Sequence, residues 1–328
     1  MYEWQKQIQI IVDEIDACIE NHEDETLTLG ALGRKLGYSE FHTTRKFKEI
    51  TGLSFRDYLR RRKLAFALKE VRDSSKSLLE IAVDYGFSSH EAFTRSFKEI
   101  YGTTPAAYRK EPKPVILRTK IHPFDRYFFG MEEIGMVKSD ERVKIYFITI
   151  PAHKFLHISN KESNGYWDFW QKQNQIPGQD YETVCGLLDS IKGKLDDVGG
   201  SEANCGSGQI MAYINDPTGR LCDWGIPRTE CWGVRLPPDY AGEVPSQMRL
   251  AEIPEGEYIV FEHGPFDYEQ ENRSVERRIE KAMVDFDYRE TEYSLDTSPG
   301  RIMYFYFNPE RYFKYIRPVQ RTKEKSVR

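Results

Sequence analysis

Two near-copies of one short segment lie in the first third of the chain, at Gly37–Ile50 and Gly86–Ile100. Each copy begins with Gly, an aromatic residue and Ser, and each ends with Arg-x-Phe-Lys-Glu-Ile; the second has one extra residue. A repeated unit of helix, glycine turn and second helix is the pattern of a helix-turn-helix. The repeat therefore predicts an all-α N-terminal domain with two such units.

Capping signals predict where the two recognition helices begin. Ser39 is the expected N-cap of the first, and Ser88 with Glu91 is the expected capping box of the second. Other expected helices cover residues 5–20, 29–36, 54–73, 78–85 and 106–110.

The helix over 54–73 sets the distance between the two units. It starts at a capping box, Ser54-x-x-Asp57, and contains no Gly or Pro before Ser74. At 1.5 Å per residue, about 19 residues span roughly 28 Å, and adjacent major-groove faces on one side of a duplex lie about 34 Å apart. This helix therefore predicts that both recognition helices reach successive grooves, with a modest DNA bend.

Charge is distributed unevenly along the chain. The whole protein has a formal net charge of −5, but residues 26–118 carry +9 and the segments on either side are acidic. A local excess of Lys and Arg is typical of a phosphate-binding surface. The repeat region is therefore the expected site of contact with DNA.

The segment from about Leu27 to Arg109 resembles the AraC-type DNA-binding domain, which has two helix-turn-helix units joined by a long helix. The matching residues include Gly37-Tyr38-Ser39, Arg45-x-Phe47-Lys48, Thr51-Gly52, Tyr58-Leu59-x-x-x-Arg62, Tyr85-Gly86-Phe87, Thr94-Arg95-x-Phe97-Lys98 and Pro105-x-x-Tyr108-Arg109. The resemblance implies binding to double-stranded promoter DNA, with RNA polymerase as a further partner.

Arg45 and Arg95 occupy corresponding positions of the two copies, and Arg forms two hydrogen bonds with guanine O6 and N7. Phosphate contact or a surface ion pair is the alternative role. Phe41 is either a thymine-methyl contact or a core residue, and Glu91 either contacts cytosine or only completes the capping box. Other expected DNA contacts are Lys46, Lys48, Lys98 and one or two of Arg60–Lys63, notably Arg62, with His42, Thr44, His90 and Thr94 beside the arginines.

The second half of the chain changes character at Glu111-Pro112-Lys113-Pro114, where a helix cannot continue. We expect the DNA-binding domain at 1–110, a linker at 111–118 and an α+β domain at 119–328. Residues 150–158 and 253–261 both read as strand, tight turn and strand, and a helical stretch and a further strand follow each. The order ββαβ occurs twice, which predicts a duplicated domain with a ligand groove.

Residues of roughly 144–318 resemble the gyrase-inhibitor-like (GyrI-like) effector-binding domain, and the whole chain then has a Rob-like architecture. The resemblance implies a small-molecule effector, often cationic or aromatic. Many such domains have a Glu six residues before the Pro of the final strand, where this chain has Met303. The missing carboxylate argues against cationic ligands and against hydrolysis.

Aromatic residues of this half are candidates to line the groove, although aromatic side chains most often form the core. Glu262 is either a polar anchor for a ligand or a solvated edge residue. An open aromatic cleft would favour ligand sensing, and a filled one would favour a protein-interaction module. The candidate effector-binding residues are Trp167, Trp170, Tyr213, Trp232, Glu262, Met303 and Phe305.

Several other functions find no support in the sequence. There is no run of 18 apolar residues and no export signal, and five irregularly spaced cysteines fit free thiols in the cytoplasm. His153 and His157 lie about 13 Å apart if they are on a strand, too far to share a metal ion. We expect no cofactor and no enzymatic activity; the alternatives are a hydrolase or a protein-interaction module fused to the DNA-binding domain.

Overall fold

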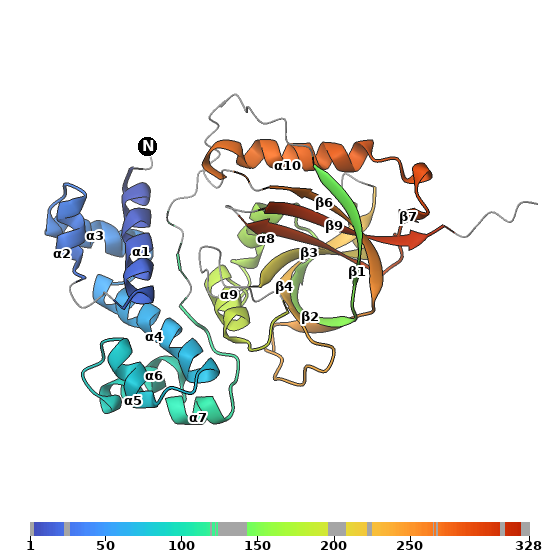
Figure 1. Ribbon diagram of the computed structural model, residues 1–328. Helices are drawn as coiled ribbons and strands as arrows, with labels where there is room; N and C mark the ends of the chain where they lie inside the picture. The colour runs from blue at the N-terminus through green and yellow to red at the C-terminus, as the bar shows by residue number, and fades with distance from the viewer. Residues whose placement is uncertain are drawn as a thin grey trace, which may run out of the picture. The chain divides into compact units, whose positions relative to one another are not determined.

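The computed structural model of the chain contains two compact units, which are described separately (Figure 1). The helical unit holds the described residues up to 123 together with Glu182–Lys192, and the sheet unit holds the others. The helical unit therefore extends beyond the boundary of 1–110 that the sequence predicts. The described residues are 3–22, 27–118, 120–121, 123, 143–195, 208–221, 225–264, 266, 268–308 and 312–322.

The helical unit contains the helices that the sequence predicts for the N-terminal domain. Apolar residues recur at helical spacing in these segments, and each one has a polar residue or a turn at its boundaries. The helices are α1 (Glu3–Glu20), α2 (Leu29–Lys35), α3 (Glu40–Thr51), α4 (Phe55–Asp73), α5 (Leu78–Asp84), α6 (His90–Tyr101) and α7 (Pro105–Lys110).

N-terminal caps fix where these helices begin. Ser77 and Glu80 form the predicted capping box of α5. The cap predicted for α6 is wrong by one residue, because Ser89 rather than Ser88 accepts the hydrogen bond from the Ala92 backbone N–H, at 3.1 Å. The one extra residue of the second repeat therefore falls in the turn before α6 and not inside the helix.

Both recognition helices, α3 and α6, end in the same way. Gly52 and Gly102 follow them with φ angles of 74° and 72°. This left-handed conformation favours glycine, because a side chain there would clash with the backbone. Since each helix has 12 residues between a Ser cap and a Gly cap, the two copies have matched lengths.

The long helix α4 has the predicted 19 residues and runs through the centre of the helical unit. Tyr58, Leu64, Leu68 and Val71 are fully buried. The helix contacts α1, α3, α5 and α7, so it joins the two helix-turn-helix units through a shared core. Burial on most sides explains why its apolar residues do not form a single stripe.

Arg62 does not lie on a DNA-facing surface, and its prediction as a phosphate contact is wrong. Its side chain is 1% exposed. The guanidinium donates to both carboxylate oxygens of Asp16 in α1, at 2.9 and 2.7 Å, and to the backbone oxygen of Arg118 at 2.5 Å. A charge at this depth needs such partners, because desolvation without them costs several kcal/mol.

The segment predicted as a linker, 111–118, packs against the helical unit. Leu117 is fully buried in the same core as α4. Helix α9 (Tyr181–Ser190) supplies the next layer: a Cβ atom on Gly186 would lie 2.4 Å from the backbone oxygen of Leu117. The Arg72 guanidinium donates to the Ser190 backbone oxygen at 2.6 Å. This segment is therefore part of a folded unit.

The sheet unit is built on antiparallel strands, as Figure 1 shows. In order across the sheet, the strands are β1-β6-β9-β8-β3-β4-β2-β5, and β7 pairs with β9. The elements are β1 (Lys144–Ile150), β2 (His153–Asn160), α8 (Tyr166–Gln173), β3 (Gln209–Leu221), β4 (Pro227–Leu236), β5 (Arg249–Ile253), β6 (Gly256–His263), α10 (Tyr268–Asp285), the 3-10 helix η2 (Tyr288–Glu290), β7 (Tyr293–Leu295), β8 (Ile302–Asn308) and β9 (Tyr312–Arg321).

The two predicted strand–turn–strand segments are present, but their strands do not pair with each other. β1 pairs with β6 and β2 pairs with β5, so each segment contributes its strands to opposite ends of the sheet. A further strand, β4 or β9, follows the predicted last strand of each ββαβ series. The sequence does not predict the short strand β7 either, so within the described residues it predicts six strand positions and omits three strands, β4, β7 and β9.

Alternation along the strands divides their side chains between two faces of the sheet. One face carries an apolar core that includes Phe155, Ala212, Tyr258 and Tyr304. The other face carries Tyr213, Met303 and Phe305, and α10 packs along β6 and β9 (Figure 1).

Candidate nucleic-acid interface

The N-caps give a structural register for comparing α3 with α6. Arg45 lies six residues after Ser39, and Arg95 lies six residues after Ser89. The two arginines therefore occupy the same turn of two helices of equal length. Phe47 and Phe97, two residues further along, are both fully buried. Each helix is thus fixed to the core by the same position, and equivalent residues point outward.

The outward positions of α3 and α6 form one stripe on each helix, at spacings of three and four residues. Arg45 and Arg95 are exposed, and in the described part of the chain neither makes a hydrogen bond or an ion pair. Thr44 with Thr94 and Lys48 with Lys98 occupy the equivalent neighbouring positions, and three of these four residues are exposed, while Thr94 is half-buried. Two unpaired guanidinium groups at matched sites are suited to an acceptor-rich partner.

Phe41 is 81% exposed, which removes the core alternative for this residue. It lies on the same stripe of α3 as Arg45, one turn nearer the N-terminus. The equivalent residue of α6 is Glu91, which is also exposed. Because Ser89 caps α6, Glu91 is not the capping-box partner that the sequence predicts.

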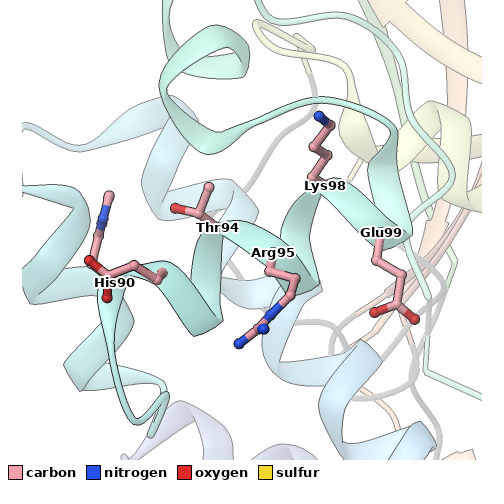
Figure 2. Close-up of a pocket in the computed structure, with 6 residues that line it drawn as sticks. His90, Thr94, Arg95, Lys98 and Glu99 are labelled. Atoms are coloured by element: carbon pink, nitrogen blue, oxygen red, sulfur yellow. The ribbon is translucent and has the colours of Figure 1, made fainter.

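A surface hollow of about 630 Å³ follows α6, and Figure 2 shows its lining. Arg95 and Glu99 extend to one side of the helix in this view, and Lys98 extends to the other. The hydroxyl of Thr94 has no hydrogen-bond partner among the described residues. The hollow is lined by His90, Glu91, Thr94, Arg95, Lys98 and Glu99.

Some predicted contact residues are engaged within the protein. The Lys46 amine binds the Glu49 carboxylate at 3.0 Å, and its side chain is 21% exposed. His42 packs edge-on against Trp4 of α1, with ring centroids 4.8 Å apart. Arg60 of α4 binds Glu99 of α6 at 3.1 Å. Lys48 and Lys98 are therefore better placed for phosphates than Lys46 is.

In the sheet unit, six of the seven predicted effector residues form two groups, and Glu262 lies apart from both. Tyr213, Met303 and Phe305 lie on one face of neighbouring strands β3 and β8, where Tyr213 is directly opposite Met303. The Arg228 guanidinium lies 4.0 Å from the centre of the Tyr213 ring. Tyr213, Met303 and Arg228 line a cavity of about 20 Å³, which has the volume of about one water molecule.

The predicted tryptophans form a second group, in which the rings pack against one another and against Tyr166. Trp170 contacts Trp232 edge-on at 5.7 Å, and Tyr166 contacts Trp167 and Trp232 at 4.7 and 5.5 Å. Trp232 donates to Gln209 at 2.8 Å. These residues pack as a cluster and do not line the cavity beside Tyr213.

Glu262 lies on the opposite face of the sheet from Tyr213 and Met303. Its carboxylate accepts from the Tyr146 hydroxyl at 2.6 Å and binds Lys314 at 2.9 Å. Partial burial raises the pKa of Glu262, but these two partners outweigh that effect and leave the pKa lowered. Glu262 is therefore held by Tyr146 and Lys314, and it does not lie beside the other candidate effector residues.

The two histidines of β2 are core residues. His153 and His157 are 2% and 4% exposed. Their ring nitrogens lie 2.8 and 3.1 Å from backbone oxygens, and His157 stacks on Phe155. Among the described residues, no three His, Cys, Asp or Glu side chains are grouped as a metal site would require, and Cys205 and Cys222 lie outside those residues. No described helix has the length and apolar character needed to span a bilayer.

One family model matches a segment in the first third of the chain. Residues 32–111 match a family model described as a helix-turn-helix domain. The regulatory protein SoxS of Escherichia coli is 34% identical over 101 residues, which are 31% of this chain and 94% of SoxS. The right origin-binding protein of Escherichia coli is 37% identical over 103 residues, which are 31% of this chain and 36% of that protein.

Among solved structures, the DNA-binding domain of AdpA in complex with a target DNA is 28% identical, covering 30% of this chain and 89% of that domain, with a TM-score of 0.27. The matched region thus spans nearly all of SoxS but about a third of the right origin-binding protein.

Proposed function

This chain belongs to the AraC family of helix-turn-helix transcription regulators, and we propose that α3 and α6 together bind one specific site on double-stranded DNA. The observation that carries this proposal is the pair Arg45 and Arg95, which occupy the same position of two matched helices and have no ion-pair partner among the described residues. A single reading helix would not need a second copy with the same type of cap, the same length and an outward arginine at the same position.

The base-reading role follows from the chemistry of the guanidinium group. Arg presents two parallel N–H donors, and guanine presents O6 and N7 as paired acceptors in the major groove. Arg45 and Arg95 are free to make this contact because neither is held by an internal partner among the described residues. The alternative, a phosphate contact, would add affinity without sequence preference.

The connecting helix α4 supports simultaneous contact by both helices. Its 19 residues span about 28 Å. One turn of B-DNA is about 34 Å, so the difference favours a site that bends toward the protein. Because α4 packs against α1, α3, α5 and α7, we expect the distance between the two helix-turn-helix units to vary little.

Arginine-to-alanine variants test the base-reading proposal. We expect Arg45→Ala and Arg95→Ala to lose about 1–3 kcal/mol of binding to a selected duplex and much less on a scrambled one. Lys48→Ala is the matched control, because loss of a phosphate contact weakens both duplexes alike. Gel-shift titrations at fixed salt measure all three. Equal losses on both duplexes for the arginine variants would refute base reading.

For the sheet unit, we propose a duplicated ββαβ domain of the GyrI-like kind that binds a small-molecule effector and modulates transcription by the chain. Support comes from the strand order, in which β3-β4-β2-β5 and β8-β9-β6-β1 run outward from the centre in matching sequence. Tyr213 and Met303, which lie at that centre, are the proposed contacts. A thermal-shift screen of small molecules on the wild type and on Tyr213→Ala tests this, since only ligands of this site lose their stabilising effect.

A protein-interaction role for the sheet unit is the second candidate. The tryptophan cluster around Trp170 and Trp232 favours it, because these rings pack edge-on against each other and against Tyr166. RNA polymerase is the proposed partner, and the cytoplasm is the proposed location. Binding of purified polymerase to the chain on its DNA site, in the absence of any small molecule, would support this candidate over effector sensing.

A further inference from the structure

Along the stripe that carries Arg45 and Arg95, the two recognition helices differ at one position and agree at three. Two residues after each N-cap, α3 carries Phe41 and α6 carries Glu91. The cap at Ser89 gives the same pairing as the shared Arg-x-Phe-Lys-Glu-Ile ending of the two copies, because Phe41 and Glu91 both lie four residues before their arginine. The three agreeing pairs are Thr44 with Thr94, Arg45 with Arg95, and Lys48 with Lys98.

Phe41 offers only apolar surface, and it is 81% exposed. The fold does not use the ring, because Phe47 fills the core position of α3. In the major groove, the apolar group on a base edge is the C5-methyl of thymine. A phenyl ring on the stripe that carries Arg45 is therefore suited to thymine beside the guanine that Arg45 would contact.

Glu91 offers only hydrogen-bond acceptors when it is ionised. Hydrogen bonds from its own backbone N–H and from Ser89, at the start of α6, lower its pKa, so the carboxylate stays charged at neutral pH. Cytosine presents the N4 amino donor, whereas guanine presents two acceptors that repel a carboxylate. Phosphates repel it as well, so Glu91 would weaken binding to any duplex that lacks a matching donor.

We propose that Phe41 and Glu91 make the two reading helices unequal, so that α3 selects a half-site with thymine near its guanine and α6 selects one with cytosine. This inference rests on the proposed function. One helical turn, about 5–6 Å, separates each of these residues from its arginine, so the discriminated base lies within about two base pairs of the guanine.

Unequal helices would fix which half-site each one occupies. If the helices were equal, a chain shifted along the duplex by one half-site would still place one helix on a half-site that it recognises. With Phe41 and Glu91 it would not. A shift in one direction places the phenyl ring of α3 against cytosine, and a shift in the other places the carboxylate of α6 against thymine, which offers no donor in the major groove. The chain therefore binds an asymmetric site in one register.

Selection of bound duplexes from a random pool tests this, using the full chain and three variants. For the wild type we expect two half-sites, each with guanine, one enriched in thymine and the other in cytosine. Phe41→Ala should lose the thymine preference alone. Glu91→Gln should change cytosine to adenine alone, because glutamine pairs with adenine N6 and N7. Glu111→Gln, an exposed acid away from both helices, is the matched control.

Binding titrations on duplexes with single base changes give the magnitude. We expect the wild type to prefer the selected base about tenfold to a hundredfold at each of the two positions. The exchange variant Phe41→Glu with Glu91→Phe should swap the two half-sites. If Glu91→Gln instead tightens binding to every duplex equally with no change of base, or if Phe41→Ala keeps the thymine preference, the inference fails. If the wild type enriches no sequence, the proposed function itself fails.

Discussion

Asp16 of α1 and Arg62 of α4 form a buried, two-point ion pair, with N–O distances of 2.9 and 2.7 Å. The pair joins a helix outside the repeat to the helix between its copies. Arg62 belongs to a run of four basic residues, Arg60–Lys63, which as a sequence resembles a phosphate-binding strip. In the folded chain, the Arg62 side chain points into the core and stabilises the helical unit through Asp16.

Removing one partner of this pair should destabilise the helical unit. We expect Arg62→Ala to lower the free energy of unfolding by about 3–5 kcal/mol, because the Asp16 carboxylate is left buried without a counter-charge. Arg56→Ala, an exposed change on the same helix, should stay within about 0.5 kcal/mol of the wild type. Urea titrations followed by far-UV circular dichroism on the full chain measure both.

The double variant Asp16→Leu with Arg62→Met should recover much of that stability, since an apolar pair of similar volume needs no desolvation of charge. If Arg62→Ala is as stable as Arg56→Ala but binds DNA more weakly, the burial argument is wrong.

The start of α6 gives a second prediction, from two adjacent serines. Ser89→Ala should cost about 0.5–2 kcal/mol, because the Ala92 N–H loses its side-chain acceptor. Ser88→Ala should change stability little, since the Ser88 side chain makes no hydrogen bond among the described residues. The same urea titrations compare them. Equal losses would mean that the cap is shared and that the register of α6 against α3 is not fixed by Ser89.

A buried histidine predicts pH-dependent stability in the sheet unit. Burial, helped by nearby Arg249, lowers the pKa of His157 below its usual value of 6.5. The unfolded chain then binds a proton more readily than the folded chain, so stability is complete above pH 6.5 and falls as the pH drops below it. The slope contributed by one group is at most about 1.4 kcal/mol per pH unit.

Unfolding titrations at pH 7.5, 6.5 and 5.5 check this prediction. His157→Gln should flatten the decline, because glutamine does not titrate. His90→Gln, on the recognition helix α6, serves as the control and should leave the decline unchanged. A wild-type stability that rises as the pH falls would contradict the assignment of a lowered pKa.

The sequence predicts most of the helical unit because its signals are local. Caps such as Ser39 and Ser77 and breaks such as Gly37 act within one turn of the helix they limit. The start of α6 cannot be located in this way, since Ser88 and Ser89 are chemically equal as caps and only the folded backbone distinguishes them. Local signals also miss the Asp16–Arg62 pair, because 46 residues separate the partners.

The sheet unit is harder to predict from sequence. Alternation locates β1 and β2, but it does not state which strand pairs with which, and the short turn between them suggests a hairpin that does not form. The aromatic candidates show the same limit. Trp170 and Tyr213 are both large and apolar, yet one packs in a filled cluster and the other lines a small cavity.

The spacing of the two half-sites tests the central claim most directly, namely that α3 and α6 contact one duplex at the same time. From a selected duplex, a series is made with zero, five or ten base pairs inserted between the half-sites, and affinity is measured by titration at fixed salt. Five base pairs turn the second half-site to the opposite side of the duplex and ten place it a full turn too far. We predict that both insertions reduce binding of the wild type to the level of Arg95→Ala on the original duplex. Equal affinity for all three spacings would contradict simultaneous contact by the two helices.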